Sequence, residues 1–318
     1  MKRVFALLVI LVFIAGLVAC ASEPEDRGIH GAIHRVEYGG NVAYLFGTLH
    51  GGHDHWFPLD DVVEDALRRS DLVAIEVDMD ELEEGMDTTV MFLPDGYTWV
   101  DILPADVYYH LVEMIEKWEF SYANLNNMNP SVLVFLLEFE MAVSLSELGV
   151  DIEDSVDAYI EAVARELGLP VIGLESIEQQ MDILFNPPFE VMLAQIINFL
   201  PPEELMELIT YGEAASLDQL AYYYENNDLD ALIREFSLEI DAGTECPYAI
   251  YMRDIIMNWR STYYANEIAR LLRETQEPTT FFVAVGLSHI IRSEAGEEFT
   301  DIVEQLRLQG FTVVPIWR

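Results

Sequence analysis

Two histidines that lie far apart in the chain each close the same four-residue pattern, Gly-x-x-His. His50 ends the segment 44–50, and His289 ends the segment 282–289. Each segment begins with a short apolar run, which predicts a buried strand. A glycine at a strand end allows the backbone to turn or to approach another group closely, because it has no Cβ. Since open α/β sheets bind ligands outside the ends of their strands, we predict that the two imidazoles share one site.

Glu76 is the third residue that could take part in the site. It is a carboxylate within the apolar, strand-like segment 72–78. A carboxylate between Ile75 and Val77 is costly to bury unless it is paired or bound to a metal ion. Two imidazoles and a carboxylate are a common ligand set for zinc, manganese, iron or cobalt, and such an ion activates water for hydrolysis. The residues alone leave an alternative open, in which Glu76 pairs with an arginine and both imidazoles bond to the backbone.

The remaining histidines fit this chemistry less well. His53 and His55 extend the first motif to His-x-x-His-x-His, and the residues alone leave open a metal cluster or a solvated loop. His30 and His34 are expected at the surface, and His110 falls within an ordinary helical run. The sequence contains no phosphate-binding loop, no Gly-x-Ser-x-Gly motif and no His-Glu-x-x-His helix, so it lacks the signatures of several common hydrolase classes.

The N-terminal residues have the pattern of an export signal. Two basic residues precede the apolar run 4–18, which is shorter than the ~20 residues that span a bilayer comfortably. The run leads through small residues to Cys20 and resembles a bacterial lipobox. An ordinary cleaved signal with an incidental cysteine is the alternative that the position of Cys20 disfavours. We predict a signal peptide over 1–19 and a tether over 20–31 that carries acyl chains such as palmitate. This would anchor the protein in the cell membrane or outer membrane, facing outside the cytoplasm.

The composition argues against several classes of partner and of metal site. The 318 residues carry a formal net charge of −41 and include two lysines, so the surface repels nucleic-acid phosphates and anionic lipid headgroups. We therefore expect no nucleic-acid partner. With Cys20 lipidated, Cys246 would have no partner for an intramolecular disulfide, and two cysteines are too few for a zinc site built on thiolates.

The order of predicted elements indicates an α/β fold, with a mixed central β-sheet, a large helical complement and both Gly-x-x-His strand ends at one site. Strands at 33–38 and 41–46 flank Gly39-Gly40 and form a predicted hairpin. The centre of the chain reads as helical, with proline punctuation. Helices are expected at 58–69, 104–118, 130–148, 156–167, 248–274 and 296–309, and further strands at 71–77, 170–174 and 311–317.

Six short blocks occur in an order that resembles the TraB/GumN family, which is related to the Tiki metalloproteases. The resemblance covers residues 32–317 and implies a single α/β domain, which we place at 32–318. The blocks are Gly-Thr-Leu-His (47–50), Pro-Leu (58–59), Val-Ala-Ile-Glu-Val-Asp (73–78), Gly-Val-Asp (149–151), Pro-Val-Ile-Gly-Leu-Glu (170–175) and Val-Ala-Val-Gly-Leu-Ser-His (283–289).

The resemblance also implies roles for particular residues. The two Gly-x-x-His units and an acidic residue form the active centre of the family, which here corresponds to His50, Glu76 and His289 as metal ligands. Arg260 matches the arginine of an Arg-Asn pair in the helix before the last motif, and would hold a ligand or substrate carboxylate. Ser261 replaces the asparagine and lacks its side-chain amide. Two further acids fall in matching blocks: Glu175, which could be an extra ligand or base, and Asp151, which could cap a helix.

The resulting hypothesis is a metal-dependent peptidase or hydrolase of the TraB/GumN type, with Glu76 and Arg260 as catalytic residues. The Tiki relatives imply manganese or cobalt, and the ligand types also suit zinc. The partners would be a peptide or protein substrate, and the membrane through the lipid anchor. The alternative is a non-catalytic lipoprotein that binds a peptide or signal in the same pocket. The sequence does not decide between them, nor does it identify a general base.

Overall fold

The computed structural model describes residues 29, 31–78, 88–120, 125–145, 150, 155–199, 201, 204, 217–241, 246–291 and 299–316. The predictions for the signal peptide 1–19, for Cys20, for His30 and for Asp151 fall outside these residues, as does most of the tether.

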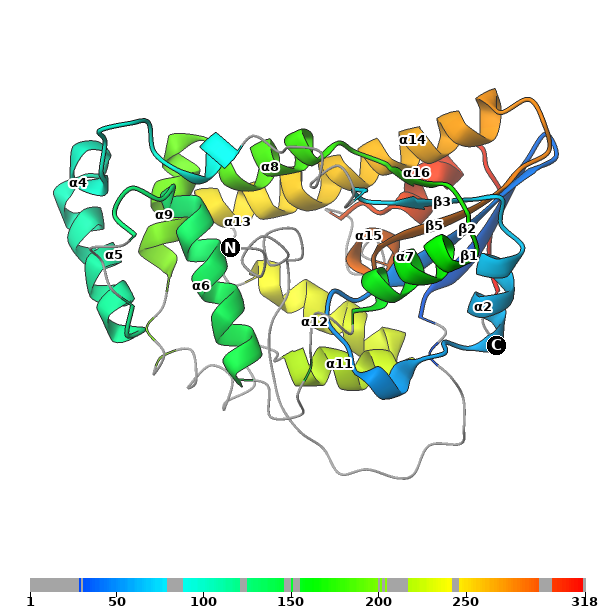
Figure 1. Cartoon of the computed structure of the whole chain (residues 1–318), viewed down its shortest axis with the longest axis horizontal. Helices are drawn as coiled ribbons and strands as arrows, with labels where there is room; N and C mark the ends of the chain where they lie inside the picture. The colour runs from blue at the N-terminus through cyan, green and yellow to red at the C-terminus, as the bar shows by residue number, and fades with distance from the viewer. Residues whose placement is uncertain are drawn as a thin grey trace.

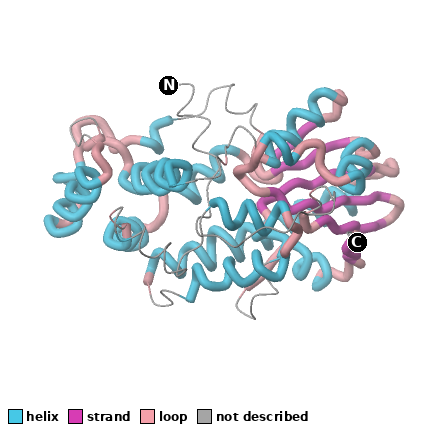
Figure 2. The backbone as a smooth tube through the Cα atoms, turned by 90° about the horizontal axis from the view of Figure 1, so that it is seen from below, coloured by secondary structure: helices cyan, strands magenta, loops and turns pink. Residues whose placement is uncertain are grey.

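A mixed six-stranded sheet forms one end of the molecule (Figures 1 and 2). Its strands follow the spatial order β4-β3-β5-β2-β1-β6. The first four in this order are parallel, whereas β1 runs antiparallel to both of its neighbours. The predicted α/β fold with a mixed central sheet is therefore confirmed. The strands are β1 (Ile33–Tyr38), β2 (Asn41–Thr48), β3 (Leu72–Ile75), β4 (Val171–Gly173), β5 (Thr280–Gly286) and β6 (Val313–Pro315).

The hairpin of β1 and β2 begins the sheet as predicted. Gly39 and Gly40 join the strands with φ angles of 61° and 102°, which glycine adopts without steric cost. Two successive residues with positive φ suit a tight hairpin, because that backbone twist matches the twist of the paired strands. The hairpin places β2 beside β5, so that Thr48 pairs with Gly286.

Helices pack against the sheet and also form a separate group at the far end of the molecule (Figure 1). Within the ranges given above, seven helices contribute buried residues to the core around the sheet. The group at the far end has its own core around Trp99, Leu111 and Ile196. The helices that pack against the sheet are α2 (Asp61–Arg68), α7 (Val156–Glu166), α11 (Leu217–Glu225), α12 (Leu229–Asp241), α14 (Arg260–Glu274), α15 (Ser288–Ile291) and α16 (Ile302–Leu308). The far group is α4 (Trp99–Ile102), α5 (Ala105–Lys117), α6 (Pro130–Leu145) and α9 (Phe189–Asn198).

The remaining helices are α8 (Ile177–Phe185), α13 (Pro247–Tyr251), the 3₁₀ turns η2 (Asp54–Trp56) and η3 (Thr88–Met91), and the π-helical segment η5 (Met252–Trp259). The single long helix predicted at 248–274 is therefore three consecutive segments, α13, η5 and α14. A π-helical stretch shifts the phase of the residues that follow it, and such stretches are frequent at functional sites. None of the helices in the described part of the chain is long and apolar enough to cross a membrane.

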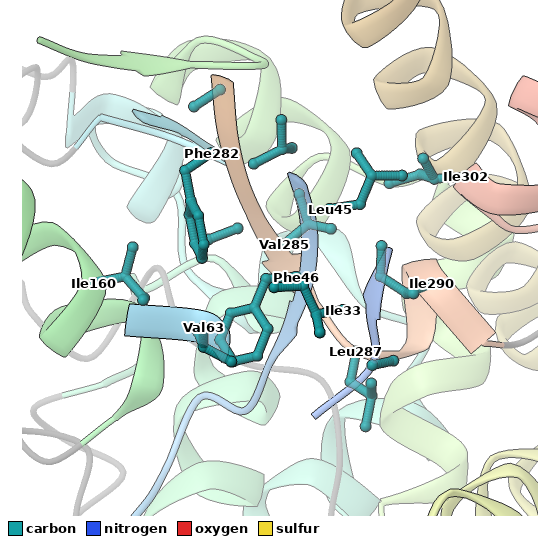
Figure 3. Packing of buried hydrophobic residues seen from close by; sticks show 14 of the residues in the cluster. Ile33, Leu45, Phe46, Val63, Ile160, Phe282, Val285, Leu287, Ile290 and Ile302 are labelled. Atoms are coloured by element: carbon teal, nitrogen blue, oxygen red, sulfur yellow. The ribbon is translucent and has the colours of Figure 1, made fainter. Parts of the chain in front are cut away.

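The two central strands of the sheet, β5 and β2, carry buried side chains on both faces. Figure 3 shows Leu45 and Phe46, which are adjacent in β2, on opposite sides of the strand. Phe46 lies toward Val63 of α2, and its ring lies 5.8 Å from that of Phe282 in β5. Leu45 lies toward the side that Ile302 of α16 occupies. Burial on both faces explains why these parallel strands are continuous apolar runs, and it holds their ends in fixed positions.

One predicted surface residue is buried. His34 lies in β1, is only 5% exposed, and pairs with Leu45 of β2 on one side and Pro315 of β6 on the other. The prediction placed His34 at the surface because it lies near the tether, and it was wrong. His34 lies on the same face of the sheet as its paired residue Leu45, which is fully buried, and the charge of Arg307 in α16 acts on it, so helix packing on this face buries the imidazole.

Candidate active site

The predicted site residues lie just beyond the carboxyl ends of three adjacent parallel strands. His50 lies two residues after β2, and Glu76 follows β3 directly. His289 lies in the short helix α15, three residues after the end of β5. Because β5 lies between β2 and β3, these ends fall along one edge of the sheet. This is the position at which α/β sheets commonly bind ligands.

Gly286, the last residue of β5, lies where the three side chains meet. Its backbone N–H donates a hydrogen bond of 2.8 Å to Glu76 Oε1. A Cβ placed on this glycine would lie 3.2 Å from Glu76 Oε1, 3.4 Å from His50 Nε2 and 3.8 Å from His289 Cδ2. The structure therefore brings His50, Glu76 and His289 together, and the missing side chain of Gly286 makes their approach feasible.

Each imidazole has a partner for its Nδ1 atom. His50 Nδ1 lies 2.8 Å from Asp157 Oδ2, and the other oxygen of Asp157 accepts a 2.5 Å hydrogen bond from Thr48 Oγ1. His289 Nδ1 lies 2.8 Å from Ser261 Oγ. In metal sites, a partner at Nδ1 fixes the orientation of the imidazole ring and leaves Nε2 for the ion. Ser261 thus supports His289 although it lacks the amide of asparagine.

Arg260 joins two carboxylates beneath this site. Its Nη2 donates to Glu76 Oε2 at 2.9 Å and to Glu175 Oε1 at 2.6 Å. Tyr264, one turn further along α14, also donates to Glu175 Oε1 at 2.6 Å. Arg260 is only 4% exposed, so its guanidinium contacts carboxylates of this chain. Of the two roles that the sequence left open for Arg260, this geometry matches the one in which it holds the carboxylate of a predicted ligand.

The surrounding charges shift two pKa values in opposite directions. Burial raises the pKa of Glu76, but the Arg260 guanidinium, the two imidazoles and the Gly286 N–H outweigh it and hold that pKa at about 2. Burial lowers the pKa of His50, but the carboxylates of Asp157 and Glu76 outweigh it and raise that pKa to about 9. Glu76 is therefore ionised at neutral pH, which is the form of a carboxylate that binds a cation. His50 is protonated at this pH and would release its Nε2 proton to the solvent on binding an ion.

The side chains match a divalent metal ion in type but are not closed around one. Among the described residues, no group of three or more His, Cys, Asp and Glu side chains is arranged to hold an ion. The donor set itself, two imidazoles held through Nδ1 and one ionised carboxylate, has the chemistry of a site for zinc, manganese or cobalt. The fit therefore rests on donor type and on convergence at Gly286.

Two residues of this network were missed by the sequence analysis. Asp157 lies in the first turn of α7, where an acidic residue is usually explained by the helix dipole. Tyr264 resembles any core aromatic residue, and its only signal is its spacing of four residues from Arg260. Glu175 was noted as a ligand or base; it is 3% exposed and its Oε1 accepts hydrogen bonds from Arg260, Tyr264 and Gln180. That position favours a supporting role for Glu175.

The other histidines in the described part of the chain lie outside the network described above. His55 is exposed, and its Nε2 lies 3.2 Å from Glu225 Oε1 at the end of α11. His53 stacks on His55 with ring centroids 5.1 Å apart. His110 is in α5, with its Nε2 3.3 Å from the backbone oxygen of Phe199.

Comparison with known proteins identifies the family. The model of the TraB/PrgY/gumN family matches residues 32–315, nearly all of the described chain. The chain belongs to the TraB/PrgY/gumN family. This confirms the family resemblance seen in the sequence, and the match spans every residue of the candidate site.

A distant relative of this family member is the Homo sapiens protein "Metalloprotease TIKI1". The two are 20% identical over 343 aligned positions, which cover 94% of this chain and 64% of the human protein. The chain thus spans less than two thirds of the length of that relative. No solved structure matches the chain.

Proposed function

We propose that this TraB/PrgY/gumN family member is a metal-dependent peptidase in which His50, Glu76 and His289 hold a divalent ion. One observation carries the proposal: the ring of each histidine and the carboxylate of Glu76 converge within 4 Å of one point at Gly286. The distant relationship to a protein named as a metalloprotease supports the same chemistry. Manganese, cobalt and zinc all suit two imidazoles and one carboxylate.

The ion would supply the electrophile, because a bound divalent metal polarises a carbonyl group and favours the hydroxide form of water. The chain supplies orientation. Asp157 and Ser261 hold the two imidazoles through Nδ1. Gly286 N–H and Arg260 each occupy one oxygen of Glu76, so that this carboxylate has little rotational freedom. In this proposal Arg260 acts as a positioning residue, because it touches Glu76 and is almost fully buried.

The direct test measures metal content and cleavage together. The full-length protein would be stripped with a chelator, reconstituted with manganese, cobalt or zinc, and assayed for bound metal and for cleavage of a peptide library. We expect about one ion per chain and cleavage that stops on chelation and returns with metal. His50→Ala and His289→Ala should each abolish both properties. His55→Ala is the matched control, because His55 is exposed and pairs with Glu225, and it should retain both.

The alternative function, peptide or signal binding without cleavage, predicts a different outcome of the same experiment. A peptide would be recovered intact from the wild-type protein, and His289→Ala would bind it with unchanged affinity. A folded wild-type protein that takes up no metal and cleaves no peptide would overturn the peptidase proposal.

We also propose that the protein is anchored by lipid on Cys20 and faces outside the cytoplasm. The support is the apolar run that ends in small residues before this cysteine. Mass spectrometry of the N-terminal peptide of the mature protein should find Cys20 as the first residue, with acyl chains attached. An unacylated N-terminus at any other residue would contradict the proposed anchor.

A further inference from the structure

The residues around His50 suggest a specific positioning residue that the family resemblance did not supply. Asp157 uses both carboxylate oxygens within the site: Oδ2 lies 2.8 Å from His50 Nδ1, and Oδ1 accepts from Thr48 Oγ1 at 2.5 Å. Its side chain is about 30% exposed, so it lies at the rim of the site. A carboxylate held from its second oxygen has a fixed direction and can fix the imidazole in turn.

The backbone near Asp157 is tied to the same strand end. The N–H of Val156 donates to the carbonyl of Leu49 at 3.1 Å, so the first turn of α7 is bonded to the segment that carries His50. Ser155 caps the helix through its side chain, which accepts from the N–H of Ala158. These bonds place the first turn of α7 directly beside the first Gly-x-x-His motif.

A second contact holds α7 one half-turn further along. Tyr159 donates a 2.5 Å hydrogen bond to Glu64 of α2, a buried carboxylate that also pairs with Arg68. The Tyr159 ring stacks on Phe57, with centroids 4.2 Å apart and planes 12° from parallel. Helix α7 is thus fixed on both sides of Asp157, to the segment after β2 and to α2.

Thr48 couples this arrangement to the second motif. It is 1% exposed, it pairs with Gly286 in the sheet, and its carbonyl accepts the N–H of Leu287 at 2.8 Å. The residue that orients Asp157 is therefore also bonded to the segment that leads to His289. A substitution at Thr48 or Asp157 would therefore change the orientation of the His50 imidazole through a short chain of hydrogen bonds.

We propose that Asp157, oriented by Thr48, is the positioning carboxylate that fixes the His50 imidazole with Nε2 directed toward Glu76. This inference rests on the proposed metal-dependent function. In metal sites, the loss of such a partner weakens metal binding by about 10–100-fold. Asp157→Asn should therefore weaken manganese binding by that factor, because an amide is a weaker acceptor for the imidazole N–H.

The experiment uses the full-length protein and two readouts. Titration calorimetry with manganese should show weaker binding by Asp157→Asn and by Thr48→Val, with near wild-type binding by Thr48→Ser, which keeps the hydroxyl. Glu161→Gln is the matched control, because Glu161 lies one turn further along α7 and pairs with Arg165. Proton NMR of the metal-free protein gives the second readout. The His50 Nδ1–H signal should exchange slowly with water in the wild type and in Glu161→Gln, and quickly in Asp157→Asn.

The two readouts separate this inference from the proposed function. A wild-type protein that binds no manganese would overturn the metal-dependent function, and the NMR signal would still decide the role of Asp157. An Asp157→Asn variant with an unchanged Nδ1–H exchange rate would overturn the positioning role. If the wild type binds manganese, an Asp157→Asn variant with the same manganese affinity would also overturn the positioning role.

Discussion

Gly286 and Glu76 are in direct contact at the end of the sheet. The N–H of Gly286 donates to Glu76 Oε1 at 2.8 Å, and a Cβ on the same residue would approach that oxygen to 3.2 Å. Few real Cβ contacts are this short, so Glu76 would have to move, although its other oxygen is held by Arg260. Gly286 lies in a regular strand, so the close approach of Glu76 and His50, and not a turn, accounts for glycine at this position.

Gly286→Ala should therefore disturb the site more than the fold. We expect manganese affinity to fall by about 10-fold or more, which is the lower limit for loss of a supporting contact at a metal ligand. Gly168→Ala is the control: its φ of 70° strains an alanine by about 1 kcal/mol, but no atom lies within 4 Å of the new Cβ. That variant should lose stability and keep its metal affinity. Equal metal affinity of Gly286→Ala and wild type would show that the convergence has no role in binding.

The sequence predicted the parts of the site that come from strands. His50, Glu76 and His289 each follow a short apolar run, and the pairing of β2, β5 and β3 brings those ends together. Asp157 and Tyr264 could not be found in this way, because they reach the site from helices. Which face of a helix meets the sheet depends on tertiary packing, and the π-helical segment before α14 changes the phase of the residues that follow it.

Arg260 should be essential for stability because it is the cation between the buried carboxylate of Glu175 and the largely buried carboxylate of Glu76. Arg260→Met would leave Glu76 and Glu175 without that partner, and breaking a buried ion pair in this way typically costs about 3–5 kcal/mol. The control Arg270→Met removes a half-exposed arginine that pairs with Glu267, and should cost about 1 kcal/mol or less. Urea denaturation of the three proteins gives the comparison. Adding Glu175→Gln to Arg260→Met should recover part of the loss, and similar costs for the two single variants would refute this account.

Ser261 should affect metal binding, with a loss of about 1 kcal/mol in stability. Ser261→Ala removes the hydroxyl that lies 2.8 Å from His289 Nδ1. A hydrogen bond of this kind contributes about 1 kcal/mol to stability, whereas loss of the partner of a metal-binding histidine weakens metal affinity by about 10-fold. Ser288→Ala is a suitable control, because Ser288 is equally buried and its hydroxyl contacts the sulfur of Met257. Calorimetric titration of both variants with manganese tests the difference, and equal affinities would remove the role assigned to Ser261.

His34 should make the protein less stable as the pH falls from about 6.5 to 4. Burial, together with the charge of Arg307, lowers the pKa of His34 to about 4, against about 6.5 in an unfolded chain. Between these values the unfolded chain binds more protons than the native one, so native stability declines with falling pH, by about 2 kcal/mol at pH 5. His34→Gln removes this contribution. The free energy of unfolding should therefore change less between pH 7 and pH 5 in the variant than in the wild type. Any cost of the substitution that does not depend on pH cancels in this difference, and an identical change in both proteins would mean that His34 is protonated in the folded state.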